Sequence, residues 1–384
     1  MVGELTGRKK VLLAGGGHAH ILALGHLDPH AADRLDISLI SPSPFTHYSG
    51  ALPGAVAGHW DAMDIRTDVL RLCEEKGIAF QEGALSGIDP DAQQAILSSG
   101  ERLPYDLLSL DIGSTTRPLD AVHGALAIRP IPAFLDGFTA ALEHDELSVS
   151  AETYVIAGAG LGGIELALAI RYRLNRNPNT ITSKVILLDA AGEILPNGKP
   201  PLRKTLRRAL ADAGIQLRTG VRIAGFADGQ VGLEDGTSIP ACLLINTTGA
   251  ASHDWLEASP LETRNGFIEV DACLRSVSHP NVWAAGDVAR FTPHPLPPAG
   301  VFAVREGPIL AENLLHFAAG RDLRPYSPQT DYLKLVSLGG KRAVAEKWGI
   351  AISLPGLWHL KKLIDFSFLR AHAFAPRDGQ NDLR

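Results

Sequence analysis

The sequence predicts an α/β protein in which one strand–turn–helix–strand unit is used twice. The first copy runs from the apolar strand and glycine turn of Val11–Gly25 to a second strand at Leu35–Ser41. The second copy runs from Thr153–Leu174 to the strand Ser183–Ala190. Short apolar strands that alternate with helical segments predict parallel sheets, so two copies of this unit predict two domains of similar architecture.

Three further strands complete this organisation. Apolar strands that end in a glycine turn follow both copies of the unit, at Tyr105–Pro118 and at Ala241–Ala250. A third strand, Asn281–Asp287, ends in Gly-Asp, and a helix follows it between about Gly300 and Gly320. From residue 321 onward, aromatic and apolar clusters predict a small C-terminal α+β domain.

Composition narrows the class of protein. The 384 residues include 36 Lys and Arg and 42 Asp and Glu, a net charge of −6 that argues against nucleic-acid binding. Cys73, Cys242 and Cys273 are sparse and widely spaced, which argues against a disulfide framework and favours a reducing compartment. No segment approaches the roughly 20 apolar residues that span a bilayer, and no early apolar run has the form of a signal peptide. We therefore expect a cytoplasmic protein.

The second glycine turn has the complete G-x-G-x-x-G pattern, with Gly158, Gly160 and Gly163. The first glycine allows a tight turn, the second lets backbone N–H groups approach a pyrophosphate, and the third lets the helix pack on the strand. Asp189 ends the next strand, where a carboxylate accepts hydrogen bonds from a ribose 2′-hydroxyl and repels a 2′-phosphate. These features predict a nucleotide-binding site that favours NADH over NADPH.

The first turn departs from this pattern at two positions. Gly15 and Gly17 are in place, but His20 occupies the third glycine position, and Ser41 stands where a strand-end acid is usual. Two roles stay open for His20, which could donate a hydrogen bond to a phosphate or could be neutral packing. Its neighbouring histidines, His18 among them, match no metal-ligand spacing, so we expect no metal site.

The strand that ends in Gly286 and Asp287 is typical of the way a flavin-binding domain closes. A carboxylate at this strand end can hold a ribityl hydroxyl, and the start of the next helix can face the flavin ring. A strand-end Asp can also cap the segment that follows it, but the two glycine turns favour the cofactor. We therefore expect FAD at the first turn and NADH at the second.

Together these motifs resemble the pyridine nucleotide-disulfide oxidoreductase superfamily, which has two Rossmann-like dinucleotide-binding domains. The resemblance also includes Asp111–Ser114 and Asn246–Gly249. It implies a discontinuous FAD domain at 1–117 and 265–320, an inserted NAD(P)H domain at 118–264, and a C-terminal domain at 321–384.

The same resemblance implies which residues contact each nucleotide. The implied FAD contacts are Gly15, Gly17, His18, Ala19, His20, Ser41, Pro53, Gly113, Gly286, Asp287, Phe302 and Ala303. The implied NADH contacts are Gly158, Gly160, Gly163, Asp189 and Gly249.

More narrowly, Gly15–His20, His47–Trp60, Ala303–Leu314 and the C-terminal tail resemble a branch related to type II NADH dehydrogenases. Members of this branch are often fused to selenophosphate synthetase, and no synthetase segment is recognised in this sequence. The histidine-bearing turn is the form that this branch has. The resemblance therefore implies an FAD turn in which His20 replaces the helix-packing glycine.

Disulfide reductases and sulfide–quinone oxidoreductases of the superfamily carry a cysteine pair beside the flavin. The corresponding segment here, Ser43–Trp60, has no cysteine, and we expect the three cysteines elsewhere to be inert buried thiols. The resemblance then implies that the flavin passes electrons directly to a small acceptor such as a quinone. It places Glu165 near the nicotinamide and Glu306 at the pyrimidine end of the ring, as catalytic residues. A first-turn acid that complements the helix dipole is the alternative for Glu165.

The tail segment Leu354–His372 predicts an amphipathic helix. Its apolar residues at helical spacing are Leu357, Leu360, Ile364 and Phe368. Basic residues in the same segment make it similar to an interfacial membrane helix. The pattern also fits a helix packed on its own domain, and both possibilities stay open.

The leading interpretation is an FAD-dependent NAD(P)H oxidoreductase that passes hydride from NADH to flavin and electrons to a quinone-like acceptor, without a redox-active disulfide. A reductase serving selenium or sulfur metabolism is the second interpretation, suggested only by the fusion partner of the branch. A flavin-binding redox sensor or scaffold with little turnover is the third, and the complete second turn argues against it. The acceptor and a homodimeric state stay open, and the expected location is the cytoplasm or the inner face of a membrane.

Overall fold

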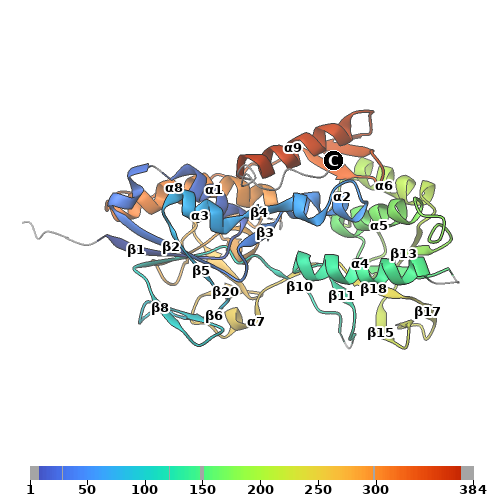
Figure 1. Ribbon diagram of the computed structural model, residues 1–384, viewed down its shortest axis with the longest axis horizontal. Coiled ribbons are helices and arrows are strands. Elements are labelled where there is room, and N and C mark those ends of the chain that lie inside the picture. Colours follow the sequence, from blue (N-terminus) through green and yellow to red (C-terminus); the bar gives the residue numbers. More distant parts are fainter. Residues whose placement is uncertain (1–7, 28, 121, 148–150, 297–298, 373–384) are drawn as a thin grey trace, which may run out of the picture.

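The computed structural model describes residues 8–27, 29–120, 122–147, 151–296 and 299–372. These residues form two lobes that lie side by side, and the C-terminal helix α9 (Leu357–His372) runs along the top of the molecule above them (Figure 1). Each lobe is built on a five-stranded parallel sheet. The predicted α/β fold with two parallel sheets is confirmed.

The first sheet has the strand order β22–β9–β1–β2–β5, and every neighbouring pair is parallel. In that order its strands are Val282–Ala284, Leu107–Leu110, Lys9–Ala14, Leu35–Ser41 and Ala79–Glu82. One face is covered by three helices, which are α1 (His18–His26), α3 (Val69–Lys76) and α8 (Gly300–Ala318). Because β22 follows the entire second lobe in the sequence, the first lobe is discontinuous.

The second sheet repeats this design, with the strand order β11–β18–β12–β13–β14 and parallel pairing throughout. In that order its strands are Leu126–Ala127, Leu243–Asn246, Thr153–Ala157, Lys184–Asp189 and Gln216–Thr219. One face is covered by three helices, which are α4 (Ile131–Leu147), α5 (Leu161–Leu174) and α6 (Pro200–Asp212). Both faces of its central strands are buried, which explains why they are continuous apolar runs.

The opposite face of each parallel sheet carries a small antiparallel sheet. In the first lobe its strands are β6 (Leu85–Asp89), β7 (Gln94–Leu97) and β8 (Arg102–Pro104). In the second lobe they are β15 (Ile223–Ala227), β16 (Gln230–Leu233) and β17 (Ser238–Pro240). The internal repeat seen in the sequence thus extends to this accessory sheet.

Two short strands join the lobes. β10 (Thr115–Thr116) leaves the first lobe, and β19 (Ala250–Ala251) leaves the second. They pair antiparallel, so the outgoing and returning connections lie side by side. The glycine turns that precede both strands therefore lie near the junction of the lobes.

The C-terminal unit consists of the antiparallel strands β24 (Lys334–Ser337), β25 (Ala343–Lys347) and β26 (Ile350–Ile352), followed by α9. It packs on the second lobe, because a Cβ atom on Gly339 would lie 2.5 Å from the carbonyl oxygen of Leu168 in α5. Helix α9 then continues to β4 (Arg66–Asp68) of the first lobe. The tail thus spans both lobes.

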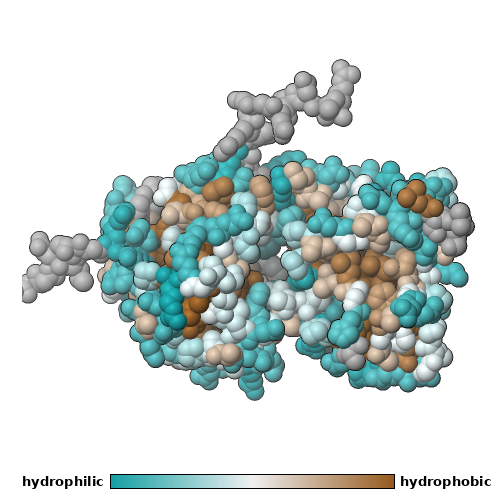
Figure 2. Space-filling model, turned by 60° about the horizontal axis from the view of Figure 1, so that its bottom comes forward, coloured by the Kyte–Doolittle hydropathy of each residue, from teal (hydrophilic) through white to brown (hydrophobic). Residues whose placement is uncertain are grey.

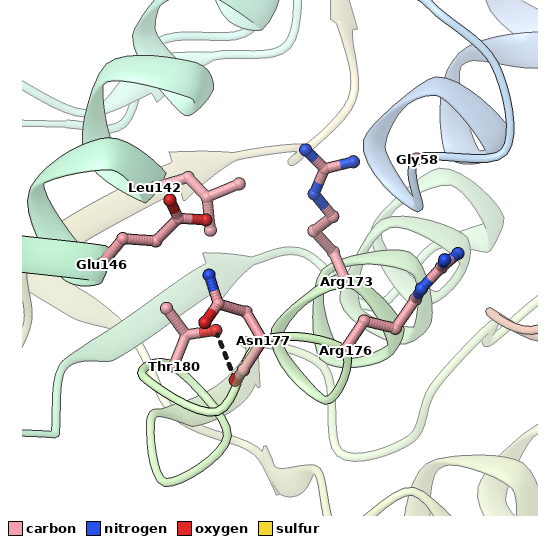
Figure 3. Close-up of a pocket in the computed structure, with 7 residues that line it drawn as sticks. All are labelled: Gly58, Leu142, Glu146, Arg173, Arg176, Asn177 and Thr180. Carbon is pink, nitrogen blue, oxygen red and sulfur yellow. Dashed lines mark hydrogen bonds between the residues drawn. The ribbon is translucent and has the colours of Figure 1, made fainter.

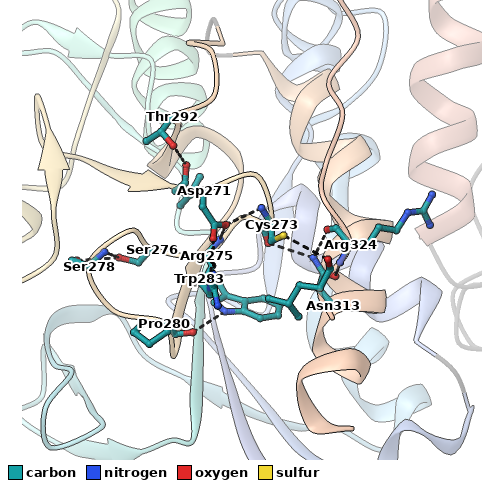
Figure 4. A network of polar contacts seen from close by, with 12 residues as sticks. Asp271, Cys273, Arg275, Ser276, Ser278, Pro280, Trp283, Thr292, Asn313 and Arg324 are labelled. Carbon is teal, nitrogen blue, oxygen red and sulfur yellow. Dashed lines mark hydrogen bonds and ion pairs between the residues drawn. The ribbon is translucent and has the colours of Figure 1, made fainter. Parts of the chain in front are cut away.

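A polar network fastens the chain that leads into this unit (Figure 4). The amide nitrogen of Asn313 in α8 donates to the carbonyl oxygens of Cys273 and Arg324, at 3.4 and 2.9 Å. In return the Arg324 N–H donates to the Asn313 side-chain oxygen at 2.7 Å. Cys273 belongs to this structural network.

The underside of the molecule is divided. Figure 2 shows an indentation at the lower edge between the two lobes, and apolar surface gathers on the right-hand lobe. Within the described part of the chain, no helix is both long enough and apolar enough to cross a bilayer.

Candidate functional site

The two glycine turns share one backbone geometry. Gly15 and Gly158 have φ angles of +97° and +103°, a region that favours glycine. Gly17 and Gly160 are the N-caps of α1 and α5, with φ/ψ of −73°/172° and −70°/177°. Each turn thus aims a helix N-terminus at the carboxyl end of its sheet, the arrangement that binds a pyrophosphate.

The second turn has open space where a ligand would approach. A Cβ atom on Gly160 or Gly162 would meet no atom within 4 Å. Gly163 faces the protein instead, because a Cβ there would lie 1.9 Å from the Gly158 carbonyl oxygen and 2.6 Å from Thr247 Oγ1. The turn therefore has the cradle and the close helix packing that a dinucleotide site requires.

Asp189 lies at the end of β13, beside the second turn. Its half-buried carboxylate accepts hydrogen bonds from the backbone N–H groups of Ala159 and Ala191, at 2.5 and 2.7 Å. A carboxylate fixed at this strand end can also accept a hydrogen bond from a ribose hydroxyl.

In the first turn, His20 lies entirely inside the protein. Because the Gly15 carbonyl can only accept, His20 Nδ1 carries the proton and donates to it at 2.7 Å. His20 Nε2 then accepts from the hydroxyl of Ser109 at 2.9 Å. Burial lowers the pKa of His20 to about 4, so the ring is neutral at physiological pH. Both ring nitrogens are engaged within the protein, as the packing role requires.

The other residues around the first turn are mostly buried. Ser41 ends β2, is 5% exposed, and lies beside Gly16, at whose Cβ position its Oγ would be 3.4 Å away. Ala19 is fully buried, whereas His18 is partly exposed. Ser41 therefore occupies the position that Asp189 has in the second lobe, without a charge.

Asp111 is a site residue that the sequence analysis named only as the first residue of the motif Asp111–Ser114, without a role. It follows β9, is 3% exposed, and accepts hydrogen bonds from the N–H groups of His20, at 3.0 Å, and Ala19. A Cβ atom on Gly17 would lie 2.2–2.3 Å from its carboxyl group, so the group packs directly on the second glycine of the turn. Burial raises the pKa of Asp111 to about 7.

Asp287 and Arg129 form an ion pair at 3.0 Å beside this turn. Ser114 joins them: its hydroxyl accepts from Arg129 at 2.8 Å and donates to Asp287 at 3.3 Å. The preceding residue, Gly286, donates its N–H to Glu306 of α8 at 2.7 Å. Burial raises the pKa of Glu306 to about 7. Glu306 thus holds the turn that presents Asp287.

The remaining residues implied for the nucleotides are split between open and buried positions. Gly113 and Gly249 have φ of +70° and +122°, and neither has an atom within 4 Å of its Cβ position. Pro53 lies in α2 (Leu52–Val56), and Phe302 and Ala303 lie in the first turn of α8. These three are buried. The open glycines, the N-termini of α1 and α5, which no side chain caps, and the Asp287 turn together form a cradle that fits FAD and NADH.

An aromatic cluster closes the start of α1. Tyr48 and Phe368 stack with ring centroids 4.9 Å apart, and His18 lies 5.4 Å from Tyr48 and 5.3 Å from Phe368. Phe368 comes from α9, so the C-terminal helix contributes a wall beside the first glycine turn. The sequence analysis identified Phe368 only as a residue of an amphipathic helix.

Charged side chains gather next to this cluster. Lys361 Nζ lies 2.9 Å from Asp365 Oδ2 and donates to the Gly50 carbonyl oxygen at 2.9 Å. Asp365 also accepts from the Tyr48 hydroxyl. Glu165 of α5 accepts the Ser337 N–H at 2.7 Å. Burial raises the pKa of both Glu165 and Asp365, and the neighbouring Lys361 lowers both.

A surface cavity of about 260 Å³ lies at the far end of α5 (Figure 3). Its walls include Arg173 and Arg176 near the helix C-terminus, and Arg173 lies against Gly58. The glycine turn is at the opposite end of this 14-residue helix. At 1.5 Å per residue that separation is roughly 20 Å, so the cavity is not part of the nucleotide site.

The cysteines lie outside the glycine turns. All three are free thiols, but only Cys73 is buried as expected, whereas Cys242 and Cys273 are partly exposed. Desolvation raises the pKa of Cys73 and Cys242 to about 12. Among the residues that the structure describes, no group of three or more His, Cys, Asp or Glu side chains could hold a metal ion.

Comparisons with known proteins agree with this geometry. An NADH dehydrogenase-like protein of Mycobacterium tuberculosis is 29% identical over 302 residues, covering 73% of this chain and 72% of that protein. A type II NADH:quinone oxidoreductase of Staphylococcus aureus is 23% identical over 394 residues, covering 93% and 94%. The sulfide:quinone oxidoreductase of Aquifex aeolicus shares the fold, with a TM-score of 0.80 at 19% identity over 96% of this chain and 93% of that one.

The family model of the pyridine nucleotide-disulphide oxidoreductases matches residues 9–307, which include both glycine turns and the Gly286–Asp287 turn. With the two parallel sheets, the discontinuous first lobe and the inserted second lobe, this match determines the family. The chain belongs to the pyridine nucleotide-disulphide oxidoreductase family and is an FAD-dependent NAD(P)H oxidoreductase.

Proposed function

We propose that the chain transfers electrons from NADH, through FAD, to a quinone-like small molecule. The observation that carries the acceptor class is the aromatic cluster of His18, Tyr48 and Phe368 beside the first glycine turn. Flat aromatic faces in a partly apolar site suit a planar ring. The S. aureus relative, which aligns over 93% of the chain, is named for quinone reduction and supports the same acceptor class.

We assign FAD to residues 1–117 and 265–320. Gly15 and Gly17 would hold its pyrophosphate through their backbone, and Asp287 a ribityl hydroxyl. When bound, FAD accepts hydride from NADH and gives two electrons to the acceptor. Glu306 acts on this site through Gly286, whose N–H it accepts at 2.7 Å.

We assign NADH to residues 118–264. The turn at Gly158, Gly160 and Gly163 would hold its pyrophosphate, and Asp189 its adenosine ribose. Gly249, with open space above it, borders the junction where the nicotinamide would reach the flavin.

We assign the acceptor side to residues 321–384 together with the aromatic cluster. Reduction of a quinone by two electrons also needs two protons. Glu165 and Asp365 are acids whose pKa is raised by burial, and Tyr48 donates to Asp365. Glu165 can supply one of the two protons from its carboxyl oxygen, and the other would come from solvent. Asp365, ion-paired with Lys361 at 2.9 Å, holds the Tyr48 hydroxyl in place.

An anaerobic titration tests this function. The purified flavoprotein should bleach rapidly with NADH, more slowly with NADPH, and recover its colour when a short-chain quinone is added. Phe368→Ala should slow reoxidation by quinone without slowing reduction by NADH, because Phe368 belongs to the proposed acceptor site and not to the glycine turn assigned to NADH. Leu363→Ala, an exposed position on the same helix, is the matched control. Unchanged reoxidation in Phe368→Ala would exclude this acceptor site.

We propose further that no redox-active disulfide takes part. The three free thiols lie outside the glycine turns, and burial raises their pKa, which disfavours the reactive thiolate. The variant with all three cysteines replaced by serine should keep its rate of quinone reduction. Loss of turnover with retained flavin would refute this part of the proposal.

The exposed apolar face of α9 suggests that the acceptor side docks on a membrane. Leu360, Leu363 and Ile364 are 41%, 63% and 44% exposed. The inward face carries the buried Trp358 and Leu369 together with the ion pair of Lys361 and Asp365. Exposed apolar side chains beside the exposed Lys362 and Arg370 are expected where a helix meets anionic lipid. The protein would then be peripheral at the inner face of a membrane.

Sedimentation with liposomes tests this docking. Leu363→Glu and Ile364→Glu together should reduce sedimentation with anionic liposomes at least tenfold, while reduction by NADH stays unchanged. Ser367→Glu, an exposed polar position on the same helix, is the control for added charge. Equal partitioning of the wild type and the double variant would refute membrane docking.

A further inference from the structure

Asp111 places a carboxyl group at the centre of the FAD cradle. It packs on Gly17 from one side, as the 2.2–2.3 Å separations from a Cβ there show. It packs on Gly286 from the other, where a Cβ would lie 2.6 Å from its Oδ1. These two glycines belong to the two backbone segments assigned to the pyrophosphate and the ribityl chain. Asp111 therefore lies between the groups that a bound dinucleotide must contact.

The charges around Asp111 are mainly negative. Asp287 from the turn after β22 raises the pKa of both Asp111 and Glu306, and Asp111 raises that of Glu306 in α8. The cation from the second lobe, Arg129, is already paired with Asp287. The imidazole of His20 is neutral, because burial lowers its pKa to about 4.

A pyrophosphate brings further negative charge to this place. The N–H groups of Ala19 and His20, which belong to the first turn of α1, already donate to Asp111. An ionised Asp111 would repel a phosphate in a poorly solvated site, where like charges interact strongly. A protonated carboxyl group would instead keep accepting those N–H groups and have its own O–H free to donate.

We propose that Asp111 binds FAD as a neutral carboxylic acid that donates a hydrogen bond to a pyrophosphate oxygen, so that FAD binding takes up one proton. Burial raises the pKa of Asp111 to about 7. The negative charge of the ligand raises it further, because it disfavours the ionised form. FAD therefore binds most tightly below this pKa and more weakly at higher pH.

The proposal rests on FAD as the cofactor and is independent of the acceptor. If the protein does not reduce quinones but FAD binding takes up a proton, only the assignment of the acceptor is refuted. If the proton uptake is absent from a protein that reduces quinones, only the role of Asp111 falls.

Titration of the FAD-free protein with FAD tests the proposal directly. In the wild type, log Kd from flavin fluorescence should rise with pH with a slope that approaches one between pH 7 and pH 9. Calorimetry at pH 8 in two buffers with different ionisation enthalpies should show uptake of close to one proton. A pH-independent Kd with no proton uptake would overturn the proposal without any variant.

Substitution identifies the group that takes up the proton. Asp111→Asn keeps an oxygen for the N–H groups and a permanent donor for the phosphate, so its Kd should be flat and about tenfold or more tighter than the wild type at pH 9. Glu306→Gln keeps the acceptor for the Gly286 N–H and should retain the slope. A slope that persists in Asp111→Asn, or vanishes only in Glu306→Gln, would assign the proton elsewhere. Far-UV circular dichroism of both FAD-free variants checks that they fold.

Discussion

The two glycine turns have the same backbone but bond their first carbonyl differently. In the second turn the Thr247 hydroxyl lies 2.7 Å from the Ala157 carbonyl oxygen and 3.0 Å from the Gly158 carbonyl oxygen, and its one proton is shared between them. In the first turn the His20 imidazole donates to the Gly15 carbonyl oxygen at 2.7 Å. The donor thus comes from the neighbouring strand in one lobe and from the helix itself in the other.

This difference is linked to the residue after the neighbouring strand. Asp111 and Thr247 are equivalent, because each donates its N–H to the last residue of the first strand, at 2.8 and 2.9 Å. Since His20 supplies the hydrogen bond to Gly15, Asp111 is free to turn toward the helix and accept its N–H groups. The residue at the third glycine position and the residue after the neighbouring strand are therefore coupled. The second lobe combines Gly163 with Thr247, and the first lobe combines His20 with Asp111.

The largest expected effect is a loss of FAD affinity from a substitution that changes only the first lobe. Asp287→Ala removes the proposed ribityl acceptor and leaves Arg129 without its partner at 3.0 Å. We expect FAD affinity to fall about 100-fold, corresponding to about 3 kcal/mol. The ratio of flavin to protein after purification, followed by an FAD titration, measures it. Asp189→Ala in the second lobe should retain its flavin, and a normally yellow Asp287→Ala protein would contradict the assignment.

The coupling of His20 with Asp111 can be tested by a double-mutant cycle. His20→Gly removes a buried ring and its bond to Gly15, so we expect a loss of about 3 kcal/mol in the free energy of unfolding. In an Asp111→Thr background the new hydroxyl can bond to Gly15 as Thr247 does to Gly158. The same substitution should then cost about 1 kcal/mol less, measured by urea unfolding of the FAD-free proteins. Equal costs in both backgrounds would mean that the two positions are independent.

The first turn should also be sensitive to acid, because only it has a buried histidine. Burial lowers the pKa of His20 from 6.5 to about 4, so the folded state prefers the neutral ring. The stability tied to that neutral ring is complete above pH about 6.5 and is lost as the pH falls toward 4. From pH 7 to pH 5 the FAD-free wild type should lose about 2 kcal/mol more than His20→Asn.

The variant comparison is needed because two acids act in the opposite direction. The pKa values of Asp111 and Glu306 are raised to about 7, so their contribution is present at low pH and is lost as the pH rises through that value. Both acids remain in His20→Asn and therefore cancel in the difference. Parallel pH profiles of the two proteins in urea unfolding would show that His20 titrates normally.

Sequence reasoning predicted the fold and the two glycine turns, because both depend on local patterns. The strand Leu35–Ser41 has the predicted bounds, and the helix expected between about Gly300 and Gly320 is α8, Gly300–Ala318. The partners of the site are not local. Asp111 is 91 positions from His20, and Arg129 is 158 positions from Asp287, so only the folded chain brings them together.

The C-terminal helix is a second case in which a local pattern predicts the element but not its tertiary contacts. The spacing of Leu360 and Ile364 predicted a helix, and α9 is one. This spacing does not determine which face of the helix turns inward. The structure buries the Lys361–Asp365 ion pair, while Leu360 and Ile364 stay exposed. The pattern of apolar residues predicts the helix, whereas its orientation depends on tertiary contacts. Trp358 and Leu369 are buried, and Tyr48 and the Gly50 carbonyl bond to the Lys361–Asp365 pair.

The smallest expected effect is on the preference for NADH over NADPH. It concerns the ends of β13 and β2, where Asp189 corresponds to Ser41. Asp189→Ser gives the second lobe the uncharged residue of the first, so it removes the repulsion of a 2′-phosphate and one hydrogen bond to the ribose of NADH. We expect the kcat/KM ratio for NADH over NADPH to fall about tenfold, corresponding to about 1.4 kcal/mol. Asp189→Asn is the matched control, because its side-chain oxygen can still accept the Ala159 N–H, which the shorter serine reaches less well. If both variants change the ratio equally, charge determines the preference; if only Asp189→Ser does, the shape of the turn at Ala159 does, and the strand-end acid is there to hold the turn.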